Sequence, residues 1–406
     1  MWNRTSEPLA ANHTRNSVEF TYTTSGTSLQ NVTGNMSVPE GCPPVRFEEM
    51  EFLPWDNPDN IITAEVENIV RRVKDTLLFI MFLIGGPANI INMAVYYKQG
   101  LKERINLCLF ALSLADELYL IQVMFIYGEQ IHLQFTTQER YGSVVRFMAN
   151  NNLAGFFAFS FVSQIMSAII ASERCLCVLS PLRFQTQLQT RTMAIIIVAV
   201  YVVPLGFYFF MATKYRIACV FDLTSESVVY IGATSEFYRN HEKLINYLDS
   251  FVYGAGIPVV VIVVVTTATI ITAIKIRRAA AWRAGTSSAN GRSLSSSSSP
   301  ISPKELVLTR MLIGVAVLFI VCISPLALFR IVSLFLPDMN IGGRYHNLYL
   351  TRHSIVETLS YANATFNIFV YYTMGLRYRE TFWGLLGRKR RDKATGKPSM
   401  TKTRNK

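Results

Sequence analysis

Several polar side chains occur inside stretches of sequence that are otherwise apolar, and their types and spacing could support chemistry. The one carboxylate among them is Asp116, and its companions are Asn89, Ser163, Asn363, Asn367 and Tyr371. The last three are four residues apart and would share one helix face. Since an ionisable group in hydrocarbon is costly unless paired, we expect a single buried cluster around Asp116. The cluster could bind a cation such as sodium, its carboxylate could titrate, or it could only hold the helices together by hydrogen bonds.

The common signatures of enzymes and of metal centres do not occur in the sequence. There is no HExxH, GxSxG or P-loop pattern, and the five histidines have no metal-ligand spacing. None of the six cysteines forms a CxxC pair. We therefore predict that the chain is not an enzyme and holds no metal centre of this kind.

The composition indicates that membrane helices position these polar residues. The 406 residues are 50% hydrophobic and only 16% charged, whereas soluble domains carry about a quarter charged residues. A helix crosses the bilayer with about 20 apolar residues. Seven stretches qualify, at residues 76–97, 105–127, 147–179, 193–211, 251–276, 306–336 and 351–374. The sequence predicts an all-α membrane protein, a bundle of seven transmembrane helices, and the most polar of its helices is the seventh.

Glycosylation sequons and basic residues predict how the chain lies in the membrane. The sequons all fall in the N-terminal tail, at Asn3, Asn12, Asn31 and Asn35. Basic residues are dense between the fifth and sixth stretches and after residue 387. The positive-inside rule then makes those segments cytoplasmic and the N-terminus extracellular, as in a plasma-membrane protein. The net charge of +12 is thus a membrane-surface and partner-facing charge, which argues against a nucleic-acid partner.

The same features divide the chain into three parts. Residues 1–72 are expected to form a glycosylated extracellular tail that is largely disordered, and residues 73–386 the helical domain. Within that domain, the cytoplasmic loop 277–304 is of low complexity and includes the serine run 295–299. Residues 387–406 form a basic cytoplasmic tail.

In these motifs the sequence resembles the rhodopsin-like G-protein-coupled receptors, over roughly residues 76–386. Asn89 and Asp116 match the family's helix-one and helix-two polar residues, and Glu173-Arg174-Cys175 matches its Asp/Glu-Arg-Tyr triplet. Pro258 and Pro325 match the prolines of helices five and six, and Phe319 matches the helix-six aromatic. Asn367 and Tyr371 match the ends of the family's Asn-Pro-x-x-Tyr. Residues 378–382 look like its short amphipathic helix on the membrane. The order of these elements along the chain makes the resemblance specific.

The sequence departs from the family pattern at several of these motifs. Ile368 replaces the proline of the helix-seven motif, and Ile323 replaces the tryptophan before Pro325. The usual disulfide from helix three cannot form, because Ala149 stands where its cysteine would be. In this topology only Cys42 and Cys219 are extracellular, so we expect them to pair; two free thiols are the alternative.

The resemblance implies a two-state switch that activates a heterotrimeric G protein. In the inactive state Arg174 would pair with Glu173, and it could also pair with Glu305 to lock helices three and six together. A ligand that prefers the open bundle would shift the equilibrium. The sixth helix would swing at Pro325, and Arg174 would turn towards Tyr371 and the G protein.

The resemblance also places candidate ligand-binding residues in the outer half of the bundle. Phe156 stands where amine receptors carry an aspartate, and Tyr361 where opsins carry the retinal lysine, so neither a monoamine nor retinal is expected. The other candidates are Gln122, Asn152, Arg330, His353 and Glu357. Arg330 and Glu357 could form an ion pair or meet opposite charges on a ligand.

Two ligand classes and one other function stay open on the sequence. Residues 106–119 are similar to invertebrate FMRFamide-type peptide receptors, and residues 172–182 to molluscan chemosensory receptors. The ligand would accordingly be a peptide or a chemosensory small molecule. A transporter or channel without G-protein coupling is the alternative, although the apolar cytoplasmic half of helix five argues against a polar path.

Overall fold

A computed structural model describes most of the helical region of the chain. The described residues are 44–45, 58–135, 158–180, 189–222, 227–289, 303–336, 338–339 and 343–387. Several predicted features lie outside them: the four sequons Asn3, Asn12, Asn31 and Asn35, Cys42, Asn152, Phe156, and most of the N-terminal tail, the serine-rich loop and the basic tail.

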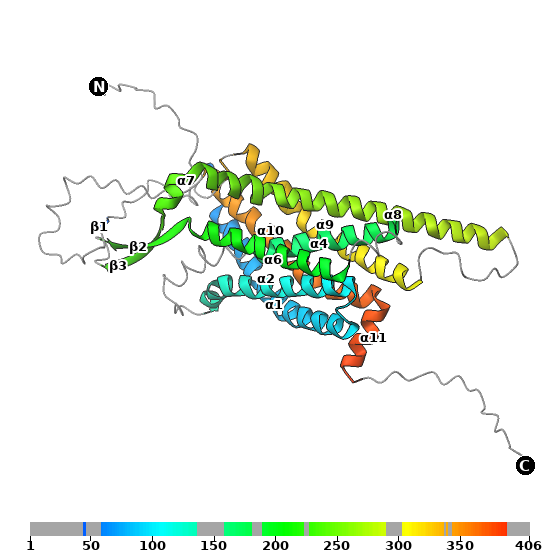
Figure 1. Cartoon of the computed structure of the whole chain (residues 1–406). Helices are drawn as coiled ribbons and strands as arrows, with labels where there is room; N and C mark the ends of the chain where they lie inside the picture. Colours follow the sequence, from blue (N-terminus) through cyan, green and yellow to red (C-terminus); the bar gives the residue numbers. More distant parts are fainter. Residues whose placement is uncertain are drawn as a thin grey trace, which may run out of the picture.

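Seven long helices lie side by side and form the body of the molecule (Figure 1). They are α1 (Ala64–Gln99), α2 (Arg104–Phe135), α4 (Ala158–Leu179), α6 (Thr190–Ala212), α8 (Ile257–Ala289), α9 (Pro303–Phe335) and α10 (His346–Met374). A π-helical segment, η5 (Leu248–Gly256), leads into α8. Each helix corresponds to one predicted stretch, and α1 begins well before the boundary predicted at residue 73. The predicted bundle is therefore confirmed.

Six of these helices are long and apolar enough to cross a membrane, and α10 is not one of them. The reason is visible in its burial, because α10 carries many buried polar residues, among them Ser360, Asn363 and Asn367. Helix α6 is at the other extreme, and only 11% of its most apolar window is buried. The helix with polar residues thus lies inside the bundle, and the most apolar surfaces face outwards.

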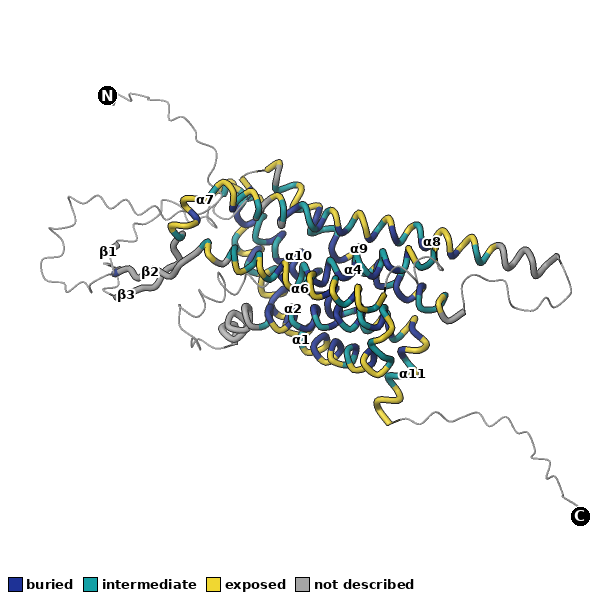
Figure 2. The backbone as a smooth tube through the Cα atoms, viewed as in Figure 1, coloured by how far each residue is buried: buried dark blue, intermediate teal, exposed yellow. Residues whose placement is uncertain are grey.

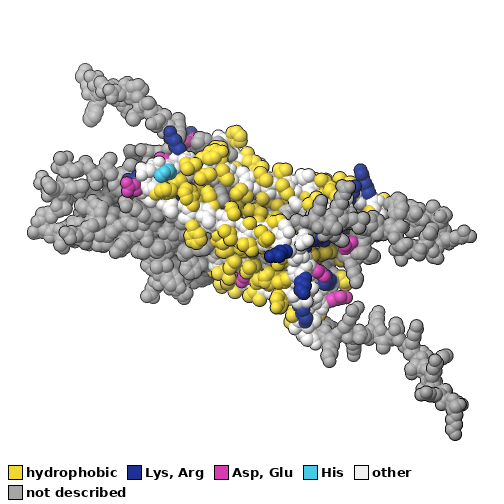
Figure 3. Space-filling model, viewed as in Figure 1, with side chains coloured by type: hydrophobic (Ala, Val, Ile, Leu, Met, Phe, Trp, Pro, Cys, Tyr) yellow, Lys and Arg dark blue, Asp and Glu magenta, His cyan; other side chains and the backbone are white. Residues whose placement is uncertain are grey.

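The outer surface of the bundle matches a lipid environment. Large aliphatic side chains such as Val202 of α6, Val263 of α8 and Val321 of α9 are more than half exposed. Exposed and buried residues alternate around the helices (Figure 2), and hydrophobic side chains cover the middle of the face that Figure 3 shows. Without water around these helices, their association relies on close packing and interhelical hydrogen bonds. At Gly85 of α1, for example, an added Cβ would lie 2.7 Å from Leu120 of α2.

A small sheet and a short helix mark one end of the bundle, hereafter the hairpin end. Strands β2 (Tyr215–Asp222) and β3 (Ser227–Thr234) form an antiparallel hairpin, and helix α7 (Glu236–Tyr247) follows. The two-residue strand β1 (Pro44–Val45) pairs in parallel with β2, so the sheet order is β1-β2-β3. No strands were predicted here from the sequence, although both hairpin strands are rich in β-branched and aromatic residues.

The opposite end, hereafter the α11 end, carries the short helix α11 (Leu376–Leu385), which turns away from α10 (Figure 1). The turn occurs at Gly375, where an added Cβ would lie only 2.5 Å from the carbonyl oxygen of Tyr371. Arg377 of α11 forms a bidentate ion pair with Glu103, at 2.8 and 3.1 Å. Helix α11 is thereby fixed to the connection between α1 and α2.

Candidate functional site

Asp116 lies at the centre of a hydrogen-bonded cluster in the middle of the bundle. Its side chain is 1% exposed and joins three helices. Ser163 of α4 donates a hydrogen bond to Oδ1 at 2.5 Å, and Asn367 of α10 donates one to Oδ2 at 2.9 Å. The Oδ1 atom of Asn367 is buried and has no hydrogen-bond partner among the described residues. The cluster therefore combines a carboxylate, a hydroxyl and an unused amide oxygen.

The other predicted members lie close by without bonding the carboxylate. Asn89 of α1 donates to the carbonyl oxygen of Ala364 in α10 at 3.0 Å. Asn363 is buried one turn before Asn367, but neither hydrogen bond to Asp116 comes from it. Asn92, which the sequence analysis did not single out, donates to Oδ1 of Asn89 at 3.4 Å.

Three tyrosines extend this polar region to the α11 end. Tyr371 is fully buried, and its ring centroid lies 5.5 Å from that of Tyr96 and 5.7 Å from that of Tyr378. The Tyr378 hydroxyl donates to Oδ1 of Asn92 at 2.6 Å. Burial raises the pKa of the Tyr378 phenol above its ordinary value, so it is a neutral donor. Asn92 and Tyr96 were missed, although their spacing from Asn89 could have placed them on one face.

A cavity of about 1280 Å³ opens at the α11 end between α2, α4, α9 and α11. Residues of both charges line it, including Arg104, Glu173, Arg174, Glu305 and Arg377. Glu173 is 2% exposed, so its carboxylate forms part of the buried wall of the cavity.

Two arginines share the Glu173 carboxylate. Arg174 donates to it from Nε and, at 2.7 Å, from Nη2, while Nε of Arg104 on α2 lies 3.8 Å from Glu173 Oε1. The thiol of Cys177 also donates to Oε1, at 3.6 Å. Among the described residues, the ion-pair partner of Arg174 is Glu173 and not Glu305, which lines the same cavity. Arg104 was not predicted from the sequence, because no local pattern connects it to a residue on another helix.

The predicted hinge and its aromatic neighbour both lie in α9. Pro325 is inside this helix, where its ring removes one backbone hydrogen bond. Phe319 is fully buried and packs in one hydrophobic cluster with Ile323 and Tyr361. Ile323, which stands in place of the family's tryptophan, is therefore a core residue beside the hinge.

Several predicted ligand-binding residues gather in the hairpin-end half of the bundle. Glu357 of α10 is 4% exposed, and its Oε2 atom lies 3.4 Å from Nζ of Lys74 and 4.0 Å from Nε2 of His353. Tyr361 donates to the carbonyl oxygen of Leu120 at 2.8 Å. Gln122 of α2 is buried as well.

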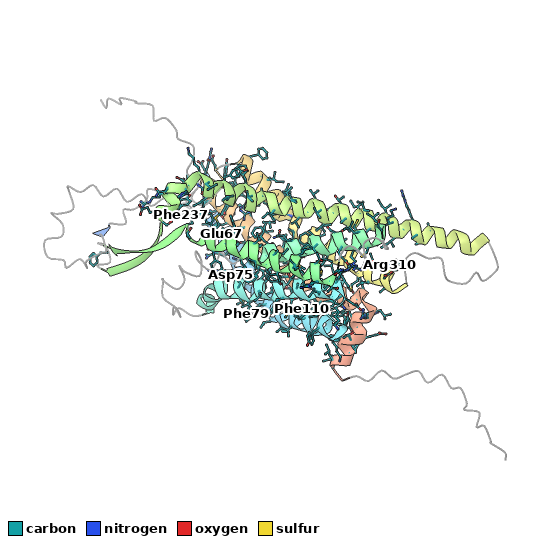
Figure 4. All side chains as sticks on the ribbon, in the orientation of Figure 1. Glu67, Asp75, Phe79, Phe110, Phe237 and Arg310 are labelled. Carbon is teal, nitrogen blue, oxygen red and sulfur yellow. The ribbon has the colours of Figure 1, made fainter. Side chains whose placement is uncertain are left out.

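The partner of Glu357 differs from the one considered in the sequence analysis. Arg330 is exposed, and Glu357 pairs with Lys74 instead. Lys74 was assigned to the segment before the first helix, but α1 extends outwards past it, so that Lys74 and Asp75 are both buried. Figure 4 labels Asp75 towards the hairpin end and Arg310 towards the opposite end.

The cysteines fall into two groups. Cys108, Cys175, Cys177 and Cys322 are free and lie in the helices. Cys219 is in β2, and its predicted partner Cys42 lies outside the described residues.

Comparison with known families agrees with this arrangement. Residues 89–371, well over half of the chain, match the family model described as the 7 transmembrane receptor (rhodopsin family). The matched region begins at the helix-one asparagine and ends at Tyr371. No curated protein matches the chain, so the comparisons support neither a peptide-receptor nor a chemosensory subfamily. The family consists of ligand-activated receptors that signal through G proteins and are not enzymes, and this chain belongs to the rhodopsin family of seven-transmembrane receptors.

Proposed function

We propose that the chain is a plasma-membrane receptor that binds its ligand at the hairpin end and its G protein in the cavity at the α11 end. The observation that carries this proposal is the buried Glu173–Arg174 pair in the wall of a cavity of about 1280 Å³. Such a cavity has room for a segment of a partner protein, and its arginine is held by a bond that must break before it can turn.

The distribution of sequons and basic residues supports an extracellular hairpin end. All four predicted sequons precede α1, whose N-terminal end lies towards the hairpin. The basic residues Lys275, Arg277, Arg278 and Arg283 lie in the second half of α8, which runs towards the opposite end, and the basic tail follows α11. The positive-inside rule then makes the α11 end cytoplasmic.

The proposed switch is an exchange of partners by Glu173. When Arg174 turns towards the G protein, it leaves behind a buried carboxylate, and an unpaired buried charge costs about 3–5 kcal/mol. Arg104 is already 3.8 Å from this carboxylate and can stay there. We infer that Arg104 is the counter-ion of Glu173 in the active state, so that activation does not leave the buried Glu173 carboxylate unpaired.

The Asp116 cluster fits a small hard cation. Asp116 offers carboxylate oxygens, Ser163 a hydroxyl, and Asn367 an amide oxygen without a partner. Oxygen ligands of this kind suit alkali and alkaline-earth ions. Bound sodium would neutralise the carboxylate, while Ser163 and Asn367 keep α4 and α10 oriented towards α2.

The pairing of β1 with β2 supports the proposed disulfide between Cys42 and Cys219. Pro44 stands opposite Phe221 in a parallel register. Two residues before Pro44 stands Cys42, and two residues before Phe221 stands Cys219. The bond would tie the N-terminal tail to the hairpin.

The decisive experiment measures nucleotide exchange on a panel of G proteins in membranes that contain the full chain. Arg174→Ala should abolish exchange, whereas Arg310→Ala, which removes an exposed arginine of α9, should leave it unchanged. Glu173→Gln should raise basal exchange, because it weakens the bond that holds Arg174. Exchange that is the same with and without Arg174 would contradict the proposed switch. The ligand class, peptide or chemosensory small molecule, would follow from screening both against the wild type.

A further inference from the structure

Two carboxylates and one ammonium group are buried together near the outer end of α1 and α10. Nζ of Lys74 lies 3.3 Å from Oδ1 of Asp75 and 3.4 Å from Oε2 of Glu357. All three side chains are at most 5% exposed. The ammonium group of Lys74 is thus shared between the two carboxylates.

Glu357 also has an oxygen that no described residue uses. Its Oε1 atom is buried without a hydrogen-bond partner, and the same is true of both amide atoms of Gln122 on α2. Buried polar atoms in native proteins nearly always have a partner. These three atoms therefore need partners that the described residues do not supply, which must be water or a molecule that enters from outside.

The two residues share one level because of the helix geometry. The rings of Tyr119 and Tyr361 are in contact, with their centroids 5.7 Å apart, and they join α2 to α10. Gln122 is three residues outward of Tyr119, and Glu357 is four residues outward of Tyr361. Both spacings keep a side chain on the same helix face. The tyrosine pair is accordingly the floor of the site, and the side chain of His353, which is 40% exposed, lies one turn outward towards solvent.

We propose that Glu357 Oε1 and Gln122 bind the N–H groups of a protonated amine or guanidinium carried by the extracellular ligand. This inference rests on the proposed receptor function and specifies the chemistry of its ligand. A carboxylate oxygen accepts most strongly from charged N–H donors, and the floor consists of aromatic rings, which attract cations.

The neighbouring arginines do not already fill this role. Arg352 donates to Ser333 and to the carbonyl oxygen of Phe329, and it lies over the ring of Tyr349. Arg330 is exposed and forms no ion pair with Glu357. The free oxygen of Glu357 is therefore left for a cation that comes with the ligand.

The test uses charged thiol reagents, so it requires neither a known ligand nor a G protein. In membranes with the full chain, Gln122→Cys is labelled from outside with cationic trimethylammonium-ethyl methanethiosulfonate or with its anionic sulfonatoethyl analogue, and wild-type labelling is subtracted. Relative to the rate ratio of the two reagents with a free thiol in solution, the carboxylate should favour the cationic reagent by at least about tenfold. Adding Glu357→Gln should abolish most of this preference. The matched control is Glu67→Gln, which removes a different buried carboxylate, one that lies on α1 and is paired with Arg71. This substitution should leave the preference for the cationic reagent unchanged.

A competition experiment completes the test. Millimolar 4-phenylbutylamine should slow the labelling of Gln122→Cys several-fold, and neutral 4-phenylbutanol should not. A preference for the anionic reagent, a preference that survives Glu357→Gln, or a cysteine that reacts only after denaturation would overturn the proposal. Protection by neither compound would mean that water alone fills the site, and it would also overturn the proposal. None of these outcomes depends on nucleotide exchange, so a failure here is distinguishable from a failure of the receptor function.

Discussion

Replacing Arg104 with Met tests whether Glu173 changes partners during activation. Methionine keeps an unbranched, mainly apolar stem and removes the guanidinium group with its charge and N–H donors, so packing of the stem against the first turn of α2 should persist. In the structure Arg174 holds both oxygens of Glu173, so in this state the loss of Arg104 removes only a secondary contact. In the active state the same substitution would leave the buried carboxylate without a counter-ion. The variant should therefore destabilise the active state relative to the inactive state.

The expected size follows from the distance and the burial of the pair. Two unit charges about 4 Å apart interact by about 4 kcal/mol at an effective dielectric constant of 20. The Arg104 side chain is 16% exposed and that of Glu173 is 1% exposed, so solvent screening is modest. Part of the attraction is present in both states and cancels. We expect Arg104→Met to destabilise the active state by about 1–2 kcal/mol relative to the inactive state, which lowers the population of the active state roughly 5- to 30-fold.

The assay is the binding of nucleotide-free G protein to the receptor in membranes, which reports the population of the active state without a ligand. Arg104→Met should weaken this binding roughly 5- to 30-fold. Lys102→Met is the control, because Lys102 lines the same cavity and does not contact Glu173. In a Glu173→Gln background the effect of Arg104→Met should vanish, since no charge is left to neutralise. Tighter binding by Arg104→Met would refute the reasoning and make Arg104 part of the inactive lock.

Three further substitutions test other parts of the structure. Tyr378→Phe removes the donor to buried Asn92 and should lower the free energy of unfolding by about 1–3 kcal/mol, measurable as a lower melting temperature of the purified receptor; an unchanged value would contradict the hydrogen bond. Asp116→Asn should abolish any effect of sodium on G-protein affinity, whereas a persisting sodium effect would place the ion elsewhere. Gly375→Ala should reduce surface expression, because its Cβ would clash with the carbonyl of Tyr371, and normal expression would show that the turn relaxes.

The Asp116 cluster could be foreseen from the sequence because lipid makes every polar residue conspicuous. A carboxylate in a stretch such as 112–116 needs partners, and the four-residue spacing of Asn367 and Tyr371 gave the face that supplies them. The structure places Ser163 and Asn367 on the two oxygens of Asp116. Local spacing and the cost of burial thus pointed to the two residues that bond Asp116, but not to Asn92 and Tyr96.

Residues at the helix ends could not be found in this way. Lys74 and Asp75 precede the apolar core of α1, so a hydropathy reading treats them as flanking residues in water. They are buried because α1 continues outwards and packs against α10, where Glu357 supplies a partner for Lys74. Arg104 was missed for a related reason, since its partner lies on another helix far along the chain. Such ion pairs depend on how helix ends meet, which spacing within one helix does not encode.

The polarity that made the seventh helix the hardest to recognise has a physical consequence for signalling. Glu357 and Tyr361 lie on one face of α10 and bond to α1 and α2. Asn367 and Tyr371 lie further along the helix, where they contact Asp116 and the tyrosines of the α11 end. A rigid helix cannot rotate at one end alone. A ligand cation that drew Glu357 away from Lys74 would therefore also strain the Asn367–Asp116 bond and the packing of Tyr371, and α10 would couple the outer site to the G-protein cavity.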